Sequence, residues 1–166
     1  MNIVPAHSRS EIGTCADIWL QATLAAHDFV PPDFWRKHLG AMKEQYLPAS
    51  EVYLFKEEGT ILGFAALYQG ALEALFVHPA CWGKGVGSRL LRHVQNLHEE
   101  LTLTVYSKNS RAVSFYLHHG FTVSKEQTCP HTGEPEVVVR WQGVKAECAS
   151  GRNRKYTQFH PFTMLL

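Results

Sequence analysis

The chain has 166 residues, of which 45% are hydrophobic, 11% aromatic and 19% charged, and its formal net charge is +1. This length suits one domain with a sizeable core, and the composition excludes a disordered chain. The small net charge gives no electrostatic reason to expect a nucleic acid or a membrane surface as partner. No apolar run reaches the ~20 residues that a membrane-spanning helix needs.

The cellular setting is predicted from the first residues and the cysteines. The first ten residues lack the long apolar stretch of a secretory signal peptide, so we expect a cytoplasmic protein. Cys15, Cys81, Cys129 and Cys148 form no CxxC pair and match no common zinc spacing. We therefore expect reduced thiols and no metal site.

Two helices are predicted before the first strand. Ser8 and Glu11 have the spacing of a capping box, which starts a helix near residue 8. The Pro31-Pro32 pair interrupts the helical pattern. Asp33 is then expected to cap a second helix, which Pro48 ends.

Three strands are predicted next. Apolar and aromatic residues around Val52 and Leu54 indicate a strand, and Glu58-Gly59 is typical of a turn. Residues 61–68 are expected to return as the second strand of a hairpin. Gly70 separates this hairpin from a third strand over residues 72–77.

Helices and strands alternate in the second half of the chain. Asn109 or Ser110 is expected to cap a short helix, and Gly120 to end it. Because both hairpin strands and helix-connected strands occur, the predicted fold class is α+β with a mixed sheet. The predicted elements are a helix over 86–97, a strand over 101–105, a helix over 112–119, and strands over 121–126 and 136–141.

The last residues differ from the rest in charge and pattern. Residues 143–166 hold four basic residues against one acidic residue and show no clear periodicity. We predict one domain over 1–142, followed by a basic extension over 143–166 that is poorly ordered or even non-native. Its apolar end is alternatively able to dock on the domain or on a second copy.

The segment from Leu72 to Gly87 carries the strongest chemical signal. A strand leads into a loop with Gly83, Gly85 and Gly87, and the loop opens a helix. Such glycines let backbone amides face a ligand, and a helix start adds unpaired N–H groups with partial positive charge. This combination suits a pyrophosphate, to which Lys84 adds charge. The spacing matches neither the dinucleotide fingerprint nor the P-loop.

A second segment follows the predicted strand over 101–105. It reads Asn109-x-x-Ala112-x-x-x-Tyr116-x-x-x-Gly120-Phe121. A phenol with a pKa near 10 is able to give a proton to a strongly basic leaving group. Tyr116 is therefore either a proton donor or a core residue.

In this order, the two segments resemble those of the GCN5-related N-acetyltransferases, the GNAT family. The family's Val-x-Pro and [QR]-x-x-G-x-[GA] motifs read here as Val77-His78-Pro79 and Trp82–Gly87, and its Asn…Ala…Tyr…Gly-Phe motif is also present. The resemblance spans residues 3–142. It implies the GNAT fold, a mixed but mostly antiparallel sheet with splayed central strands and flanking helices. It also implies an N-acetyltransferase that uses acetyl-coenzyme A.

The resemblance also implies roles for individual residues. The amine attacks the thioester directly in a ternary complex, Tyr116 is the general acid for the leaving thiolate, and Asn109 contacts the cofactor arm. The backbone around Phe76 and Val77 holds pantetheine and polarises the thioester carbonyl. The pyrophosphate site is expected to comprise Trp82, Gly83, Lys84, Gly85, Val86, Gly87 and Ser88.

Two positions depart from the family pattern. Trp82 stands where Gln or Arg is usual, and its indole is expected to stack on the adenine or to lie over the loop. Thr104 stands where many relatives have a glutamate, and threonine is not a useful base. A non-catalytic module that senses acetyl-coenzyme A is therefore the alternative function, although the intact Tyr116 argues against it.

The acceptor side is less defined by the sequence. The predicted substrate-binding residues are His27, Phe29 and Glu73, and the candidate bases are Glu73, His78, His27 or a chain of water molecules. The aromatic residues at 29, 34, 35 and 68 either line an acceptor groove or belong to the core. The expected acceptor is a primary amine: a lysine side chain, a protein N-terminus or a small molecule. Both a monomer and a homodimer fit the family.

Overall fold

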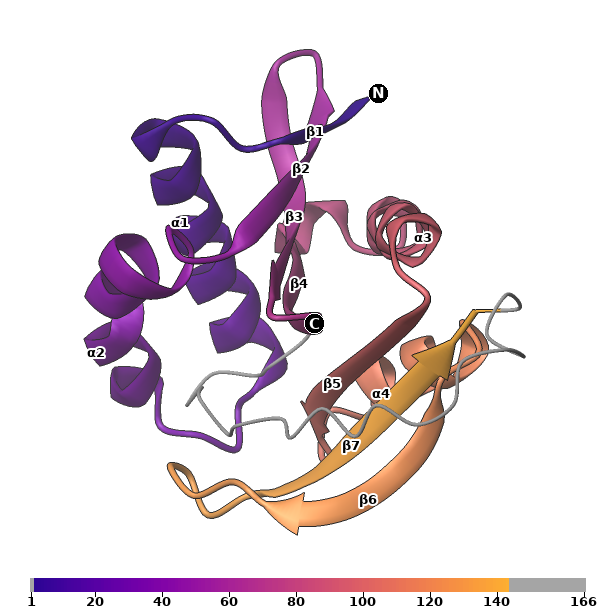
Figure 1. Cartoon of the computed structure of the whole chain (residues 1–166). Coiled ribbons are helices and arrows are strands. Elements are labelled where there is room, and N and C mark those ends of the chain that lie inside the picture. Colours follow the sequence, from indigo (N-terminus) through magenta and orange to yellow (C-terminus); the bar gives the residue numbers. More distant parts are fainter. Residues whose placement is uncertain (1, 144–166) are drawn as a thin grey trace.

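A computed structural model describes residues 2–143 of the chain (Figure 1). Apart from Gly143, the predicted extension over 143–166 lies outside the described residues. The described elements are β1 (Asn2–Pro5), α1 (Arg9–Ala26), α2 (Pro32–Ala41), a π-helical turn (Met42–Tyr46), β2 (Glu51–Glu57), β3 (Thr60–Tyr68), β4 (Ala71–Val77), a short 3₁₀ helix (Pro79–Cys81), α3 (Val86–Leu97), β5 (Glu100–Tyr106), α4 (Ser110–His118), β6 (Thr122–Thr128) and β7 (Pro135–Gln142).

The strands form two antiparallel sheets. One has the order β1-β2-β3-β4 and the other the order β5-β7-β6. Strands β4 and β5 pack next to each other, but no ladder of hydrogen bonds joins them in residues 2–143. The predicted mixed sheet is thus divided into two at the position where the resemblance implies splayed central strands.

Helices cover both faces of the first sheet. Figure 1 shows α1 and α2 together on one side of β1–β4 and α3 on the other, with α4 behind β5 and β7. Trp19 of α1 and Trp35 of α2 meet edge to face, with ring centroids 6.1 Å apart, and both are fully buried. Trp35 is therefore a core residue and not part of an acceptor groove.

Local sequence signals explain most element boundaries. The capping box at the start of α1 is present, because Ser8 Oγ accepts from the amide of Glu11 and the Glu11 carboxylate accepts from the amide of Ser8. The β2–β3 turn has positive φ at Glu58 and Gly59, which matches the right-handed twist of a tight hairpin. Asn109, not Ser110, caps α4 by accepting from the amide of Ala112.

Two local predictions are wrong. Strand β1 was not predicted. It is a four-residue edge strand that forms by pairing with β2, which is distant in the sequence. Asp33 does not cap α2, which begins at Pro32 with Pro31 as its N-cap. The fixed φ of a proline suits the first helical position, so the helix starts two residues earlier than predicted, and Asp33 pairs with Arg36.

Within residues 2–143, no helix is long and apolar enough to cross a bilayer. In the same range, no group of three or more His, Cys, Asp or Glu side chains is arranged to hold a metal ion.

Candidate active site

A cleft of about 550 Å³ opens between the β4–α3 loop and the first turn of α4. Its lining includes Val77, the last residue of β4, and Lys108 and Asn109, which follow β5, so the cleft lies at the ends of these two strands. The predicted cofactor residues that line it are Val77, Trp82, Gly83, Gly85, Val86, Gly87, Ser88 and Asn109. The lining residues that were not predicted are Ala25, Ala26, Cys81, Lys108, Ser110, Arg111, Ala112 and Phe115.

The glycine-rich loop has the geometry of an anion site. Gly83 and Gly85 have φ values of 76° and 81°, which disfavour any residue with a Cβ. Gly85 is the N-cap of α3 and has no side chain to cap it, so the first amides of the helix lack a side-chain acceptor from that position. Val86, Gly87 and Ser88 line the cleft and form the first turn of α3, where the N–H groups carry partial positive charge.

Trp82 lies at the junction between the loop and the core. Its Nε1–H donates to the carbonyl oxygen of Val77 over 2.8 Å, which orients the indole along the end of β4. Arg111 comes from the opposite side of the cleft, and its guanidinium lies over the indole, 4.5 Å from the ring centroid. The indole therefore lies against the end of β4 and packs against both hydrophobic cores.

Asn109 connects the cleft to the end of α1. Its Oδ1 accepts from the amide of Ala112, so its Nδ2 faces Nε2 of His27, 3.1 Å away. His27 is 1% exposed, and burial lowers its pKa to about 4. The ring is neutral at pH 7, accepts the Asn109 amide proton at Nε2 and carries its own proton on Nδ1, which is buried without a partner.

Tyr116 lies deeper than the cleft lining. It is fully buried, and its ring packs edge to face on Phe115 and Phe121. Burial raises the pKa of its phenol well above 10, and the hydroxyl is buried without a hydrogen-bond partner in residues 2–143. A phenol in this state keeps its proton at pH 7.

Two predicted cofactor residues lie outside the cleft lining. The side chain of Phe76 is fully buried against Phe64, with ring centroids 6.0 Å apart. This leaves only its backbone for the predicted contact with pantetheine. Lys84 is exposed and does not line the cleft, although Gly83 and Gly85 on either side of it do.

The predicted acceptor residues do not form one site. Glu73 is half-buried on β4 and, like His27, is not part of the cleft lining. The ring of Phe29 lies 5.5 Å from that of His27, and the ammonium of Lys108 stands 5.6 Å above its centroid. Lys108 also pairs with Glu134 at 2.6 Å, which brings the α1–α2 loop, the β5–α4 turn and the β6–β7 turn together.

Sequence reasoning missed two charged residues near the site. Arg111 lines the cleft, and its place two residues after Asn109 is the signal that would have found it, since the first turn of α4 faces the loop. Glu136 is 6% exposed, accepts from Nε2 of Gln127 over 2.7 Å, and has a pKa raised by burial. The sequence placed Glu136 in the last predicted strand but gave no sign that it is buried. Its burial depends on the register of β7 on β5, where it lies opposite Tyr106.

The fold and the cleft define a class of protein: an α+β protein with two adjacent antiparallel sheets and a cleft between a glycine-rich loop and the start of a helix. The family described as acetyltransferase (GNAT) domain matches residues 48–123. The chain is also 32% identical over 138 residues to the peptidyl-lysine N-acetyltransferase YiaC of Escherichia coli K12, covering 82% of this chain and 94% of YiaC. It is 32% identical over 119 residues to the peptidyl-lysine N-acetyltransferase YjaB of the same organism, covering 71% and 80%.

Solved structures agree with this relationship. The solution structure of apo YjaB from Escherichia coli has a TM-score of 0.72 at 28% identity and covers 86% of this chain and 99% of its own. The PaiA N-acetyltransferase of Thermoplasma acidophilum, solved with coenzyme A, shares the fold with a TM-score of 0.70 at 18% identity, covering 86% and 99%. The chain belongs to the GNAT acetyltransferase family. This confirms the predicted family, the fold class and an N-acetyltransferase that takes its acetyl group from acetyl-coenzyme A and passes it to an amine.

Proposed function

We propose that this chain transfers the acetyl group of acetyl-coenzyme A to lysine side chains of proteins, using the cleft between the glycine-rich loop and α4. The observation that carries the proposal is the uncapped, glycine-led start of α3 opposite Asn109 in one cleft. Two curated relatives that are named peptidyl-lysine N-acetyltransferases support the acceptor class. The three free cysteines of the described residues, Cys15, Cys81 and Cys129, support a reducing compartment such as the cytoplasm.

The residues that bind acetyl-coenzyme A act by holding it in a fixed orientation. The amides of Val86, Gly87 and Ser88 hold the pyrophosphate, and the end of β4 at Val77 holds the pantetheine arm in the gap beside β5. Asn109 fixes the start of α4 against this arm, because its side chain caps the helix and is itself held by His27. The bound cosubstrate supplies an activated thioester.

Tyr116 supplies the proton for the departing thiol. In the transfer, a bond forms between the nitrogen of the neutral amine and the acetyl carbon, the carbon–sulfur bond breaks, and the sulfur takes the phenolic proton. The proton that the nitrogen loses on forming the amide passes to solvent, and solvent returns a proton to the phenolate. Burial raises the pKa of the phenol well above 10, so the phenol is protonated at pH 7 and has a proton to give. Its lack of a competing partner in the described residues supports this role.

The amine must lose a proton before it attacks, since a lysine amine with a pKa near 10.4 is almost entirely charged at pH 7. His78 uses Nδ1 to accept from the amide of Ala80 in the short helix after β4. His27 has both ring nitrogens committed, Nε2 to Asn109 and Nδ1 to its own proton. Proton removal is thereby left to Glu73 or to water, and a pH–rate profile of Glu73→Gln separates the two.

A peptide assay tests the acceptor class. The substrate is a peptide with an acetylated N-terminus and one internal lysine. The matched controls are the same sequence with arginine for lysine, and the arginine peptide with a free N-terminus. We expect acetylation of the lysine peptide alone, measured by mass spectrometry. Modification of the free N-terminus alone would overturn the lysine assignment, and binding of acetyl-coenzyme A without turnover on any amine would favour the sensing module.

A further inference from the structure

Arg111 is the one cation in the described residues that both lines the cleft and stacks on an aromatic ring of the opposite wall. It projects from the first turn of α4, whereas Trp82 comes from the loop after β4. The two side chains thus meet across the cleft, with the guanidinium 4.5 Å from the indole centroid. This distance is well inside the range of a favourable cation–π contact.

The hydrogen-bonding capacity of Arg111 is unused. A guanidinium has five N–H donors, and within residues 2–143 Arg111 makes no hydrogen bond or ion pair. Stacking occupies the face of the planar group and leaves the N–H groups at its edge available. An exposed arginine without a carboxylate partner, at the rim of an anion-binding cleft, has the donor set for a bidentate phosphate contact.

Trp82 is itself held in place. Its Nε1–H donates to the carbonyl oxygen of Val77, and its ring packs against both hydrophobic cores. The indole is therefore a fixed platform, and stacking on it limits the rotamers available to the long arginine side chain. A side chain that is already oriented loses less conformational entropy when it binds its ligand.

We propose that Arg111, oriented by Trp82, binds the pyrophosphate of acetyl-coenzyme A from the side opposite the α3 amides. This rests on the proposed function, because it places a second phosphate contact in the same cleft. The amides of Val86–Ser88 hold the anion from one wall and the guanidinium holds it from the other. Trp82 thus contributes to cofactor binding in this chain, because it positions the guanidinium that neutralises the bound phosphates.

Calorimetric titration of acetyl-coenzyme A into the full-length wild type and variants tests the proposal. Arg111→Gln should weaken binding about tenfold to a hundredfold, the range of a hydrogen-bonded charge. Trp82→Leu, which removes the platform, should weaken it about twofold to fivefold. The double variant should bind no more weakly than Arg111→Gln alone, because the platform acts only through the arginine. Additive losses in the double variant would overturn the positioning role of Trp82.

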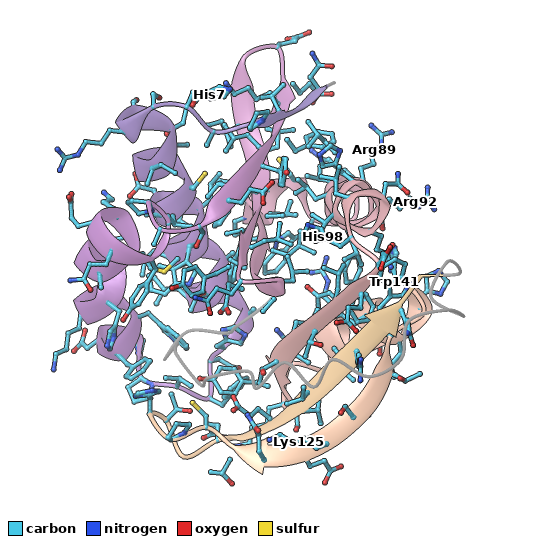
Figure 2. The ribbon with its side chains drawn as sticks, viewed as in Figure 1. His7, Arg89, Arg92, His98, Lys125 and Trp141 are labelled. Atoms are coloured by element: carbon cyan, nitrogen blue, oxygen red, sulfur yellow. The ribbon has the colours of Figure 1, made fainter. Side chains whose placement is uncertain are left out.

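The control charge change is Arg92→Gln. Arg92 is exposed on α3 and points away from the body of the protein in Figure 2, so its loss should leave affinity within twofold. Equal losses for Arg92→Gln and Arg111→Gln would reduce the effect to general electrostatics and overturn the proposal. So would an Arg111→Gln variant that binds like the wild type.

A second ligand distinguishes the two phosphate groups of the cosubstrate. The Arg111→Gln loss should persist with acetyl-dephospho-coenzyme A, which keeps the pyrophosphate but lacks the 3′-phosphate. Disappearance of the loss with this ligand would overturn the pyrophosphate assignment. A wild type that binds neither ligand would overturn the cofactor cleft itself, which separates failure of the proposed function from failure of this inference.

Discussion

The donor side and the acceptor side of this enzyme are built in different ways. We place the donor side on one short stretch of chain, residues 82–88, which lines the cleft at every position except Lys84 and turns at Gly83 and Gly85 with positive φ. On the acceptor side, we infer that the amine meets three turns that are distant in the sequence, where Lys108 lies over the ring of Phe29 and pairs with Glu134. Backbone groups bind without rearrangement, whereas the acceptor-side charges are already paired with each other. We infer that a cationic acceptor at these turns competes with Lys108 for the carboxylate of Glu134.

The largest expected effect breaks the donor side. Gly85→Asp places a carboxylate beside the predicted pyrophosphate and should remove measurable binding of acetyl-coenzyme A in calorimetry. The variant should still fold, because a Cβ at Gly85 meets no atom within 4 Å and only its φ of 81° costs energy. Gly59→Asp is the matched control, with a φ of 79° and equally open space in the β2–β3 turn. Normal affinity in Gly85→Asp would contradict the site.

The next largest effect concerns the chemical step. Tyr116→Phe should lower kcat by about 10²–10⁴ and leave the affinity for acetyl-coenzyme A unchanged. It should not destabilise the fold, since the deleted hydroxyl is buried without a partner in the described residues. Steady-state kinetics together with thermal unfolding check both statements. A normal kcat would reject the general-acid role, and a large loss of stability would show that the hydroxyl has a structural partner.

A smaller effect concerns the link between the two sides. His27 is neutral when folded, with a pKa of about 4, whereas the unfolded chain takes up its proton below pH 6.5. The stability that the buried neutral ring contributes is therefore fully present above pH 6.5. It is lost as the pH falls towards 4, and the total loss is about 3 kcal/mol. The difference in unfolding free energy between wild type and His27→Gln should shrink by this amount from pH 7 to pH 4. A difference that does not change with pH would contradict the buried neutral ring.

The smallest expected effect sharpens the acceptor side. Glu134→Gln removes the carboxylate that pairs with Lys108, a half-exposed pair whose loss is worth at most about 1 kcal/mol. The KM for a lysine peptide should rise about twofold to fivefold, and the affinity for acetyl-coenzyme A should not change. A change confined to the cosubstrate would place Glu134 on the donor side instead.

The sequence predicted what depends on local pattern. The capping box of Ser8 and Glu11, the glycine-led start of α3 and the cap at Asn109 all lie within a few residues of their partners. The contact between His27 and Asn109 spans 82 residues, so no local pattern indicates it. The stack of Arg111 on Trp82 was missed for the same reason. The burial of Glu136 was missed because the burial of a strand residue depends on its neighbours in the adjacent strands, which the sequence alone does not give.

The most direct test of the account follows the backbone amides by two-dimensional NMR while coenzyme A is added. The account predicts the largest shifts at Gly85, Val86, Gly87 and Ser88, with smaller shifts at the first turn of α4. The turns around Phe29 and Glu134 should shift least. Shifts concentrated in those acceptor-side turns, with the loop before α3 unchanged, would contradict the claim that the backbone of this loop forms the cofactor site.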